Sequence, residues 1–205
     1  RNALGINADL SQIESVDQIV DKTIQSFGRI DILFNNAGII RRAPLIYINN
    51  IIPVFFTEFA SHTSDGSDLP LWARRINDLA LSTIETMAYP GFDDSSASII
   101  PALFPERGEL VLRKTTAGTL SSTDLDTHLS SLEVGSVVVC GVNTDVCVGQ
   151  TARELADRGY DVVIVEDGCA TLSPAAHQAT LETFGVLFGQ ARSADEIIGE
   201  LGGAT

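Results

Sequence analysis

One thiol in this sequence stands where a nucleophile would be placed. Cys147 follows a run of β-branched residues at 137–139, a glycine-containing turn and the polar residues 143–145. The apolar pattern after it has helical spacing and is formed by Val148, Ala152, Leu155 and Ala156. This order predicts a buried strand, a tight loop and a helix whose first turn contains Cys147. Unpaired backbone N–H groups and the helix dipole would lower the pKa of a thiol there and favour a nucleophilic thiolate.

The other titratable groups that could act with this thiol are less distinctive. Cys140 and Cys169 end apolar runs, so they read as small buried hydrophobic residues. Lys114 ends the predicted strand 109–114 and precedes Cys147 by 33 residues, which is room for one helix and one strand. We therefore expect Lys114 and Cys147 at the ends of neighbouring parallel strands. A lysine at a strand end is ordinarily just solvated, and His177, on a predicted helix, reads as structural or as a subunit contact.

The segments around both residues resemble a known superfamily. Residues 141–148, Gly-Val-Asn-Thr-Asp-Val-Cys-Val, are similar to the nucleophile segment of the isochorismatase-like cysteine hydrolases. The likeness extends through residues 151–152, 159–160 and 165–168, and residues 52–57 and 115–119 fit the same pattern. It covers residues 46 to 190. The superfamily includes nicotinamidases, N-carbamoylsarcosine amidases, and ureidoacrylate and biuret hydrolases.

The resemblance implies a mechanism and a set of site residues. Lys114 would be the catalytic lysine, an aspartate at the end of the first strand the general base, and Cys147 the nucleophile. The backbone N–H groups of Asn143 and Cys147 would form the oxyanion hole, with a cis peptide bond between Val142 and Asn143. The reaction would be hydrolysis of an amide, ureide or N-carbamoyl C–N bond in a small molecule, without a cofactor, in a homo-oligomer. The thiol argues against isochorismate hydrolysis, which family members perform without it.

The general base is the weakest part of this assignment, because the usual Asp-Met-Gln-Asn-Asp signature is missing. Asp9 and Asp31 are the two acids that could replace it. Asp9 precedes the next predicted strand at Val54 by 45 residues, and Asp31 precedes it by 23. A parallel crossover with its helix fits the longer interval better, so Asp9 is preferred. A surface acid that caps the following helix is the open alternative for Asp9.

Residues 1–44 are atypical, because they resemble an internal piece of a short-chain dehydrogenase. The likeness rests on residues 27–38, which include Asn-Asn-Ala-Gly, and on the helical pattern before them. The chain lacks the glycine-rich pyrophosphate loop and the Tyr-x-x-x-Lys pair that such an enzyme needs. The segment is therefore either fused from another gene or a sequence imperfectly assigned to this region.

Residues for binding substrate are expected in two places. Trp72, Arg74 and Arg75 could form a lid that pairs with a carboxylate or carbonyl of the substrate, or could instead pair with acids of the protein. Thr119 belongs to the loop after Lys114. The loop near His62 resembles the place where nicotinamidases hold a metal, but two of the expected ligands are replaced, so no metal is predicted.

Composition narrows the remaining possibilities. The 205 residues are 44% hydrophobic and predict a single-domain α/β fold, a doubly wound, Rossmann-like, three-layer parallel sheet. A formal charge of −14 argues against nucleic acid and anionic membranes as partners. Three cysteines without disulfide-like spacing, and no signal peptide or membrane span, predict a cytoplasmic protein. Two other functions stay open: a catalytically silent binding or oligomeric module, and an NAD(P)-dependent dehydrogenase fragment.

Overall fold

The chain folds into parallel strands that alternate with helices. A computed structural model describes residues 53–99 and 103–201. The strands are β1 (Phe55–Phe59), β2 (Leu110–Lys114), β3 (Ser136–Val142), β4 (Asp161–Ala170) and β5 (Gln190–Arg192). Every strand pairing among them is parallel. The predicted α/β class with parallel strands is confirmed.

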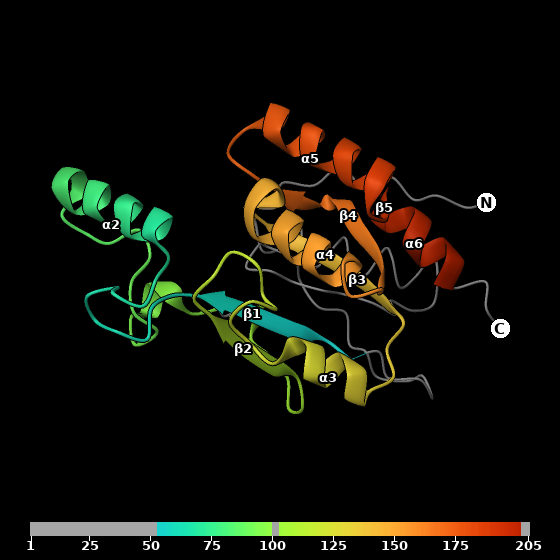
Figure 1. Cartoon of the computed structure of the whole chain (residues 1–205), viewed down its shortest axis with the longest axis horizontal. Coiled ribbons are helices and arrows are strands. Elements are labelled where there is room, and N and C mark those ends of the chain that lie inside the picture. Colours follow the sequence, from blue (N-terminus) through green and yellow to red (C-terminus); the bar gives the residue numbers. More distant parts are fainter. Residues whose placement is uncertain (1–52, 100–102, 202–205) are drawn as a thin grey trace.

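Helices connect the strands and cover them. They are α2 (Leu71–Ile84), α3 (Leu125–Ser131), α4 (Gly149–Ala156), α5 (Pro174–Leu187) and α6 (Ala194–Leu201). A short 3-10 turn, η1 (Ser95–Ala97), and a π-helical turn, η3 (Thr144–Val148), complete the set. In Figure 1, α4, α5 and α6 lie with β3–β5, α3 lies beside β1 and β2, and α2 stands apart. Ser173 caps α5 and Pro174 occupies its first position, as the sequence predicts.

The order of the strands differs from one expectation. In the described ranges β1 pairs with β2, and β3, β4 and β5 form a second sheet. Lys114 at the end of β2 and Cys147 after β3 therefore do not follow hydrogen-bonded neighbours, and that prediction is wrong. The spacing along the chain fixed only that a helix and a strand lie between them, whereas pairing depends on contacts across the whole fold.

One hydrophobic cluster nevertheless joins the two sheets. Phe55 and Leu112 contribute from β1 and β2, and Val139 and Ile164 contribute from β3 and β4. Helices complete it with Leu125, Leu129, Ala152, Leu155, Leu181 and Phe184. The β-branched and aromatic residues of the strands pack on both faces, which accounts for their nearly continuous apolar runs. The shared cluster holds the end of β2 at a fixed place relative to the end of β3.

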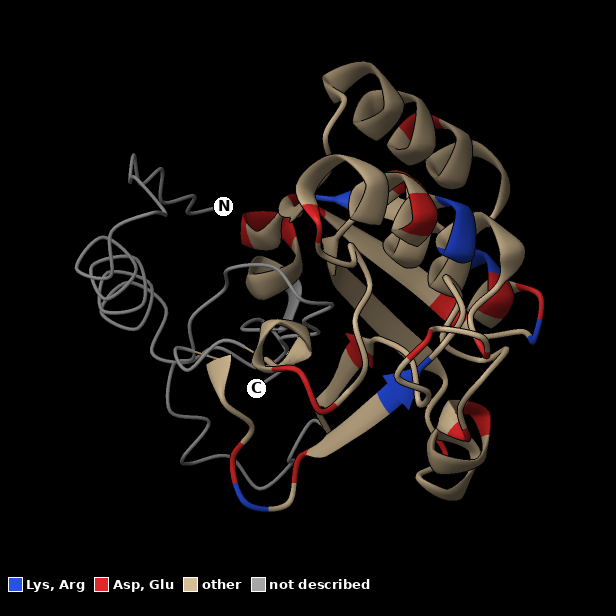
Figure 2. Cartoon of the chain, turned by 90° about the vertical axis from the view of Figure 1, so that its left-hand side faces the viewer, with Lys and Arg blue, Asp and Glu red and all other residues tan. Residues whose placement is uncertain are grey.

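The surface matches the composition. Figure 2 shows acidic residues spread over most elements and only a few basic ones. Among the helices that the structure describes, none combines the length and apolar character needed to cross a bilayer.

Candidate active site

Cys147 lies in the π-helical turn η3, between the end of β3 and the start of α4. The carbonyl of Asn143 accepts hydrogen bonds from the N–H groups of Val146 and Val148, both at 3.1 Å. The expected first α-helical turn is thus a wider turn, and α4 begins only at Gly149. The peptide bond between Val142 and Asn143 is cis. The thiol is partly exposed, so a reactant can reach it.

The two amides that the resemblance assigns to the oxyanion hole belong to this segment. Asn143 immediately precedes η3, and Cys147 lies within it.

Side chains from α5 and from the loop after β4 contact this turn. Thr144 is fully buried, and its Oγ1 lies 2.8 Å from Nδ1 of His177 on α5. The Thr171 hydroxyl donates to Oδ1 of Asp145 at 2.5 Å. His177 thus contacts the nucleophile turn, in line with the structural interpretation of its sequence position.

Lys114 is buried completely and interacts with the side chain of Cys147. Its Nζ donates to the carbonyl of Ala117 at 2.6 Å and lies 5.6 Å from the ring centre of Phe59. Burial lowers the pKa of Lys114, while Cys147 and the Glu154 carboxylate oppose that shift by favouring the ammonium. The sequence predicts that Lys114 and Cys147 lie close together. In the structure they do, although one ends a strand of the first sheet and the other follows a strand of the second.

Aromatic rings form a second wall of the site, next to Lys114. Phe59, at the end of β1, stacks on Trp72 at 5.7 Å between ring centres and meets Tyr89 edge-on at 4.9 Å. Burial raises the pKa of Tyr89, and a charged Cys147 raises it further, so the phenol lies within electrostatic range of the thiol. We call Phe59, Trp72 and Tyr89 the aromatic wall.

The remaining predicted residues are placed as follows. Arg74 and Arg75 are exposed on α2, next to Trp72 in the chain. Thr119 is buried, and its Oγ1 lies 3.1 Å from the Thr151 hydroxyl on α4. Asp9 and Asp31 lie outside the described residues. His62 and Asp68 share no metal-like cluster, since the described part of the chain contains no group of three His, Cys, Asp or Glu suited to an ion.

Two features of the site were missed from the sequence. Phe59 and Tyr89 are 30 residues apart and share no motif, so no local signal joins them. Glu154 was also overlooked, although it follows Cys147 by seven positions with Thr151 between them. Thr151 and Glu154 are three residues apart and share one face of α4, and that face meets the loop after Lys114.

Comparison with known proteins assigns the family. The chain is 30% identical to the isochorismatase family protein YwoC of Bacillus subtilis over 102 residues, which are 50% of this chain and 54% of YwoC. It is 26% identical to the N-carbamoylsarcosine amidase of an Arthrobacter species over 72% of this chain and 54% of that protein. The alignments thus span about half the length of these relatives.

A solved structure shares the fold. The cysteine hydrolase of Pseudomonas syringae pv. phaseolicola 1448A superposes with a TM-score of 0.65 at 21% identity, covering 97% of this chain and 84% of that one. The family model "Isochorismatase domain" matches residues 21–196, a range that begins inside the atypical segment 1–44. Since that match spans most of the sequence, the chain belongs to the isochorismatase family.

Proposed function

We propose that this protein hydrolyses a C–N bond of a small amide, ureide or N-carbamoyl compound through a thioester on Cys147. The observation that carries the proposal is the meeting of a partly exposed thiol with a completely buried lysine side chain beside it. A buried ammonium stabilises an adjacent thiolate, which is the form that attacks carbonyl carbon. The kinship with N-carbamoylsarcosine amidase supports the choice of bond.

The reaction then follows in two halves. The Cys147 sulfur attacks the carbonyl carbon. The carbonyl oxygen becomes negatively charged, and hydrogen bonds from the N–H groups of Asn143 and Cys147 stabilise that charge. The C–N bond breaks, the nitrogen leaves with the proton that the thiol gave up, and a thioester remains. Water attacks the thioester, releases a carboxylic or carbamic acid and returns the thiol.

A carboxylate must carry that proton between thiol, leaving group and water. We assign this role to Asp9, with Asp31 as the alternative. Parallel rate measurements on Asp9→Asn and Asp31→Asn separate the two, because only the base variant loses the thioester-forming step. A normal rate in both variants would contradict the assignment of either acid.

The aromatic wall is proposed to receive the substrate, with Trp72 as its most exposed member. Trp72 is 37% exposed, so its ring has surface left for a planar amide group. Arg74 and Arg75, on the same helix, would receive a carboxylate or carbonyl of the substrate. Thr119 would act by fixing the loop that follows Lys114, because its hydroxyl already has a partner in Thr151.

The decisive experiment measures product release from the full chain with nicotinamide, N-carbamoyl amino acids, ureidoacrylate-like compounds and biuret. We expect one class to be hydrolysed and Cys147→Ala to be inactive, while Cys169→Ala, which removes a different thiol, keeps the wild-type rate. Mass spectrometry after a rapid acid quench should find the acyl group on Cys147. Equal rates in Cys147→Ala and wild type would overturn the proposal.

A homo-oligomer is part of the proposal. Helix α2 exposes several large apolar side chains, among them Leu79 at 64% and Ile84 at 65%. Exposed apolar side chains gathered on one helix are a common feature of association sites. Light scattering coupled to gel filtration should give a mass that is a multiple of 21.9 kDa.

A further inference from the structure

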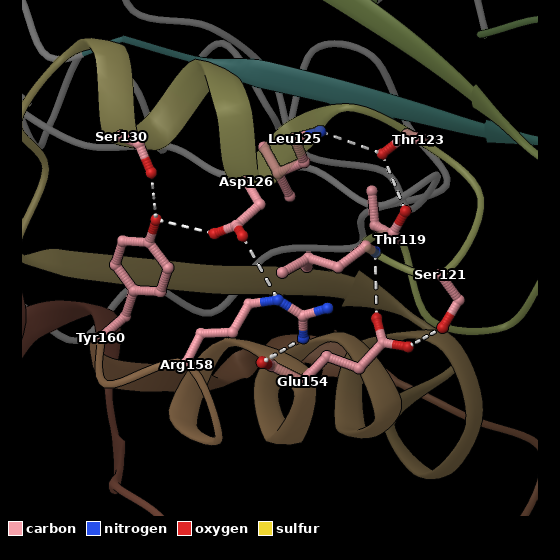
Figure 3. A network of polar contacts seen from close by, with 10 residues as sticks. Thr119, Ser121, Thr123, Leu125, Asp126, Ser130, Glu154, Arg158 and Tyr160 are labelled. Atoms are coloured by element: carbon pink, nitrogen blue, oxygen red, sulfur yellow. Dashed lines mark hydrogen bonds and ion pairs between the residues drawn. The ribbon is translucent and has the colours of Figure 1, made fainter.

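The loop after Lys114 is fastened to the helix that follows Cys147. Glu154, on α4, accepts a hydrogen bond from the N–H of Leu120 at 3.0 Å and another from the hydroxyl of Ser121 (Figure 3). Thr151, one turn earlier, accepts from the N–H of Thr119 at 3.1 Å. A single helix face therefore holds three consecutive residues of the loop.

The fit at this contact is close. A Cβ atom on Gly118 would overlap the Glu154 carboxylate, so the loop backbone lies directly against that group. Lys114 in turn donates to Ala117, the residue before Gly118. The position of the Lys114 ammonium thus depends on a loop whose other end is held by Glu154.

Helix α4 is itself tied to α3 by a second set of contacts. Arg158 reaches the Asp126 carboxylate at 3.4 Å and donates to the carbonyl of Glu154 at 3.0 Å, and the Tyr160 hydroxyl donates to Asp126 at 3.0 Å (Figure 3). The segment just after α4 is thus fastened to α3, while Thr151 and Glu154 on α4 hold the loop after Lys114.

We propose that Glu154 is a positioning residue, which fixes the loop after Lys114 and supplies the negative charge that keeps the buried lysine an ammonium beside Cys147. The inference rests on the proposed function of Lys114 and Cys147 and adds a third, indirect member to their pair. Burial alone would favour a neutral lysine, and two anionic groups within electrostatic range oppose this, the Cys147 thiolate from η3 and Glu154 from α4. Tyr89 faces the same thiol from the aromatic wall.

The small number of lysines in the sequence allows the charge state of Lys114 to be measured directly. The sequence contains only two lysines, Lys22 and Lys114. In protein labelled with ¹³C-lysine, the Cε region of the NMR spectrum therefore has two signals, and Lys114→Met assigns them. A pH titration then reports the ionisation of Lys114 without any substrate.

The test compares Glu154→Gln with wild type. The amide keeps the shape of the side chain and removes its charge, so we expect the Lys114 titration to move to lower pH by about 0.5 unit or more. The alkaline limb of kcat/KM should move in the same direction. Asp157→Asn is the matched control, because it removes one charge from an exposed position at the end of the same helix and should leave both curves unchanged.

A second variant keeps the inference falsifiable where Glu154→Gln does not fold. Glu154→Asp retains the charge at a shorter reach, so Lys114 should titrate close to its wild-type pH. An unshifted Lys114 in folded Glu154→Gln, or an equally large shift in Glu154→Asp, would overturn the inference. A failed proposed function looks different, because Cys147→Ala would then stay active whatever Lys114 does.

Discussion

The two walls of the site are built on different principles. The polar wall, formed by the loop after Lys114 and by α4, is held by hydrogen bonds that the backbone N–H groups of Thr119 and Leu120 donate to Thr151 and Glu154. The aromatic wall is held by ring contacts of Phe59, Trp72 and Tyr89, and α2, which carries Trp72, stands apart in Figure 1. The polar wall therefore rests on directional contacts to the loop backbone, whereas the rings of the aromatic wall meet through less directional packing.

This difference separates chemistry from substrate choice. Reacting groups must be held within fractions of an ångström, and directional hydrogen bonds provide that precision. Ring stacking is less directional, so it tolerates substrates of different outline. Changes in the polar wall should thus alter kcat, and changes in the aromatic wall should alter KM. The following predictions test that division, beginning with the largest effect.

Lys114→Met should remove about 10³-fold of kcat, since it deletes the cation beside the thiol while keeping the length of the buried side chain. KM should change little. A steady-state comparison with wild type, using the substrate that the screen identifies, checks this. A wild-type kcat in this variant would mean that Lys114 takes no part in the reaction and that the polar wall does not determine kcat.

The same substitution should stabilise the fold by on the order of 1 kcal/mol near neutral pH, because it removes the cost of burying a charge. The pKa of Lys114 is lowered in the folded state, so the unfolded chain binds more protons between the folded and the unfolded pKa. The wild type therefore gains stability as the pH rises through that window and loses it as the pH falls. Urea unfolding of wild type and Lys114→Met at several pH values should show that the difference between their free energies of unfolding becomes smaller toward alkaline pH.

Trp72→Ala should raise KM about tenfold with a small change in kcat, because it removes the partly exposed ring of the aromatic wall. Trp72→Phe keeps a ring for stacking, so its KM should lie between those of the wild type and Trp72→Ala. Steady-state kinetics of the three proteins separate the parameters. A loss confined to kcat would contradict the division between the walls.

Asn77→Ala should destabilise the protein by about 1–3 kcal/mol. The buried Asn77 amide donates to the carbonyl of Tyr89 at 2.9 Å and accepts from its N–H at 2.7 Å, so it fastens α2 to the aromatic wall. Ser82→Ala, on the same helix, changes an exposed side chain and is the control. Equal urea midpoints for the two variants would mean that α2 needs no such fastening.

The smallest effect concerns the thiols. Burial raises the pKa of Cys169 to about 12, so at pH 8 only about one molecule in 10⁴ carries its thiolate. Cys140 is buried as well. Iodoacetamide at pH 8 should therefore add one label, at Cys147, and Cys169→Ala should not alter the labelling rate. A second label on Cys169 would contradict this assignment.

The part of the site around Cys147 and Lys114 could largely be predicted, because its sequence signals are local. The β-branched run before Cys147, the glycine turn and the helical pattern lie within one short segment, and Lys114 is marked by the loop that follows it. The π-helical form of the turn was not predicted, because Asn143, Thr144 and Asp145 read equally well as an ordinary helix cap.

The aromatic wall could not be predicted, because its residues come from β1, from α2 and from the loop after α2. Phe59, Trp72 and Tyr89 share no periodicity, and their meeting depends on how the loops before and after α2 fold. The prediction that the strands before Lys114 and Cys147 are neighbours failed for the same reason, since spacing along the chain does not specify which strands pair. The predicted base, Asp9, lies outside the described residues.

The overlap that a Cβ atom at Gly118 would cause with Glu154 has an evolutionary consequence. A side chain at position 118 requires the Glu154 carboxylate to move away and give up its two hydrogen bonds, or a shorter residue at position 154. The two positions should therefore change together when family sequences are aligned, and a library randomised at both should recover activity in pairs that single randomisation never yields.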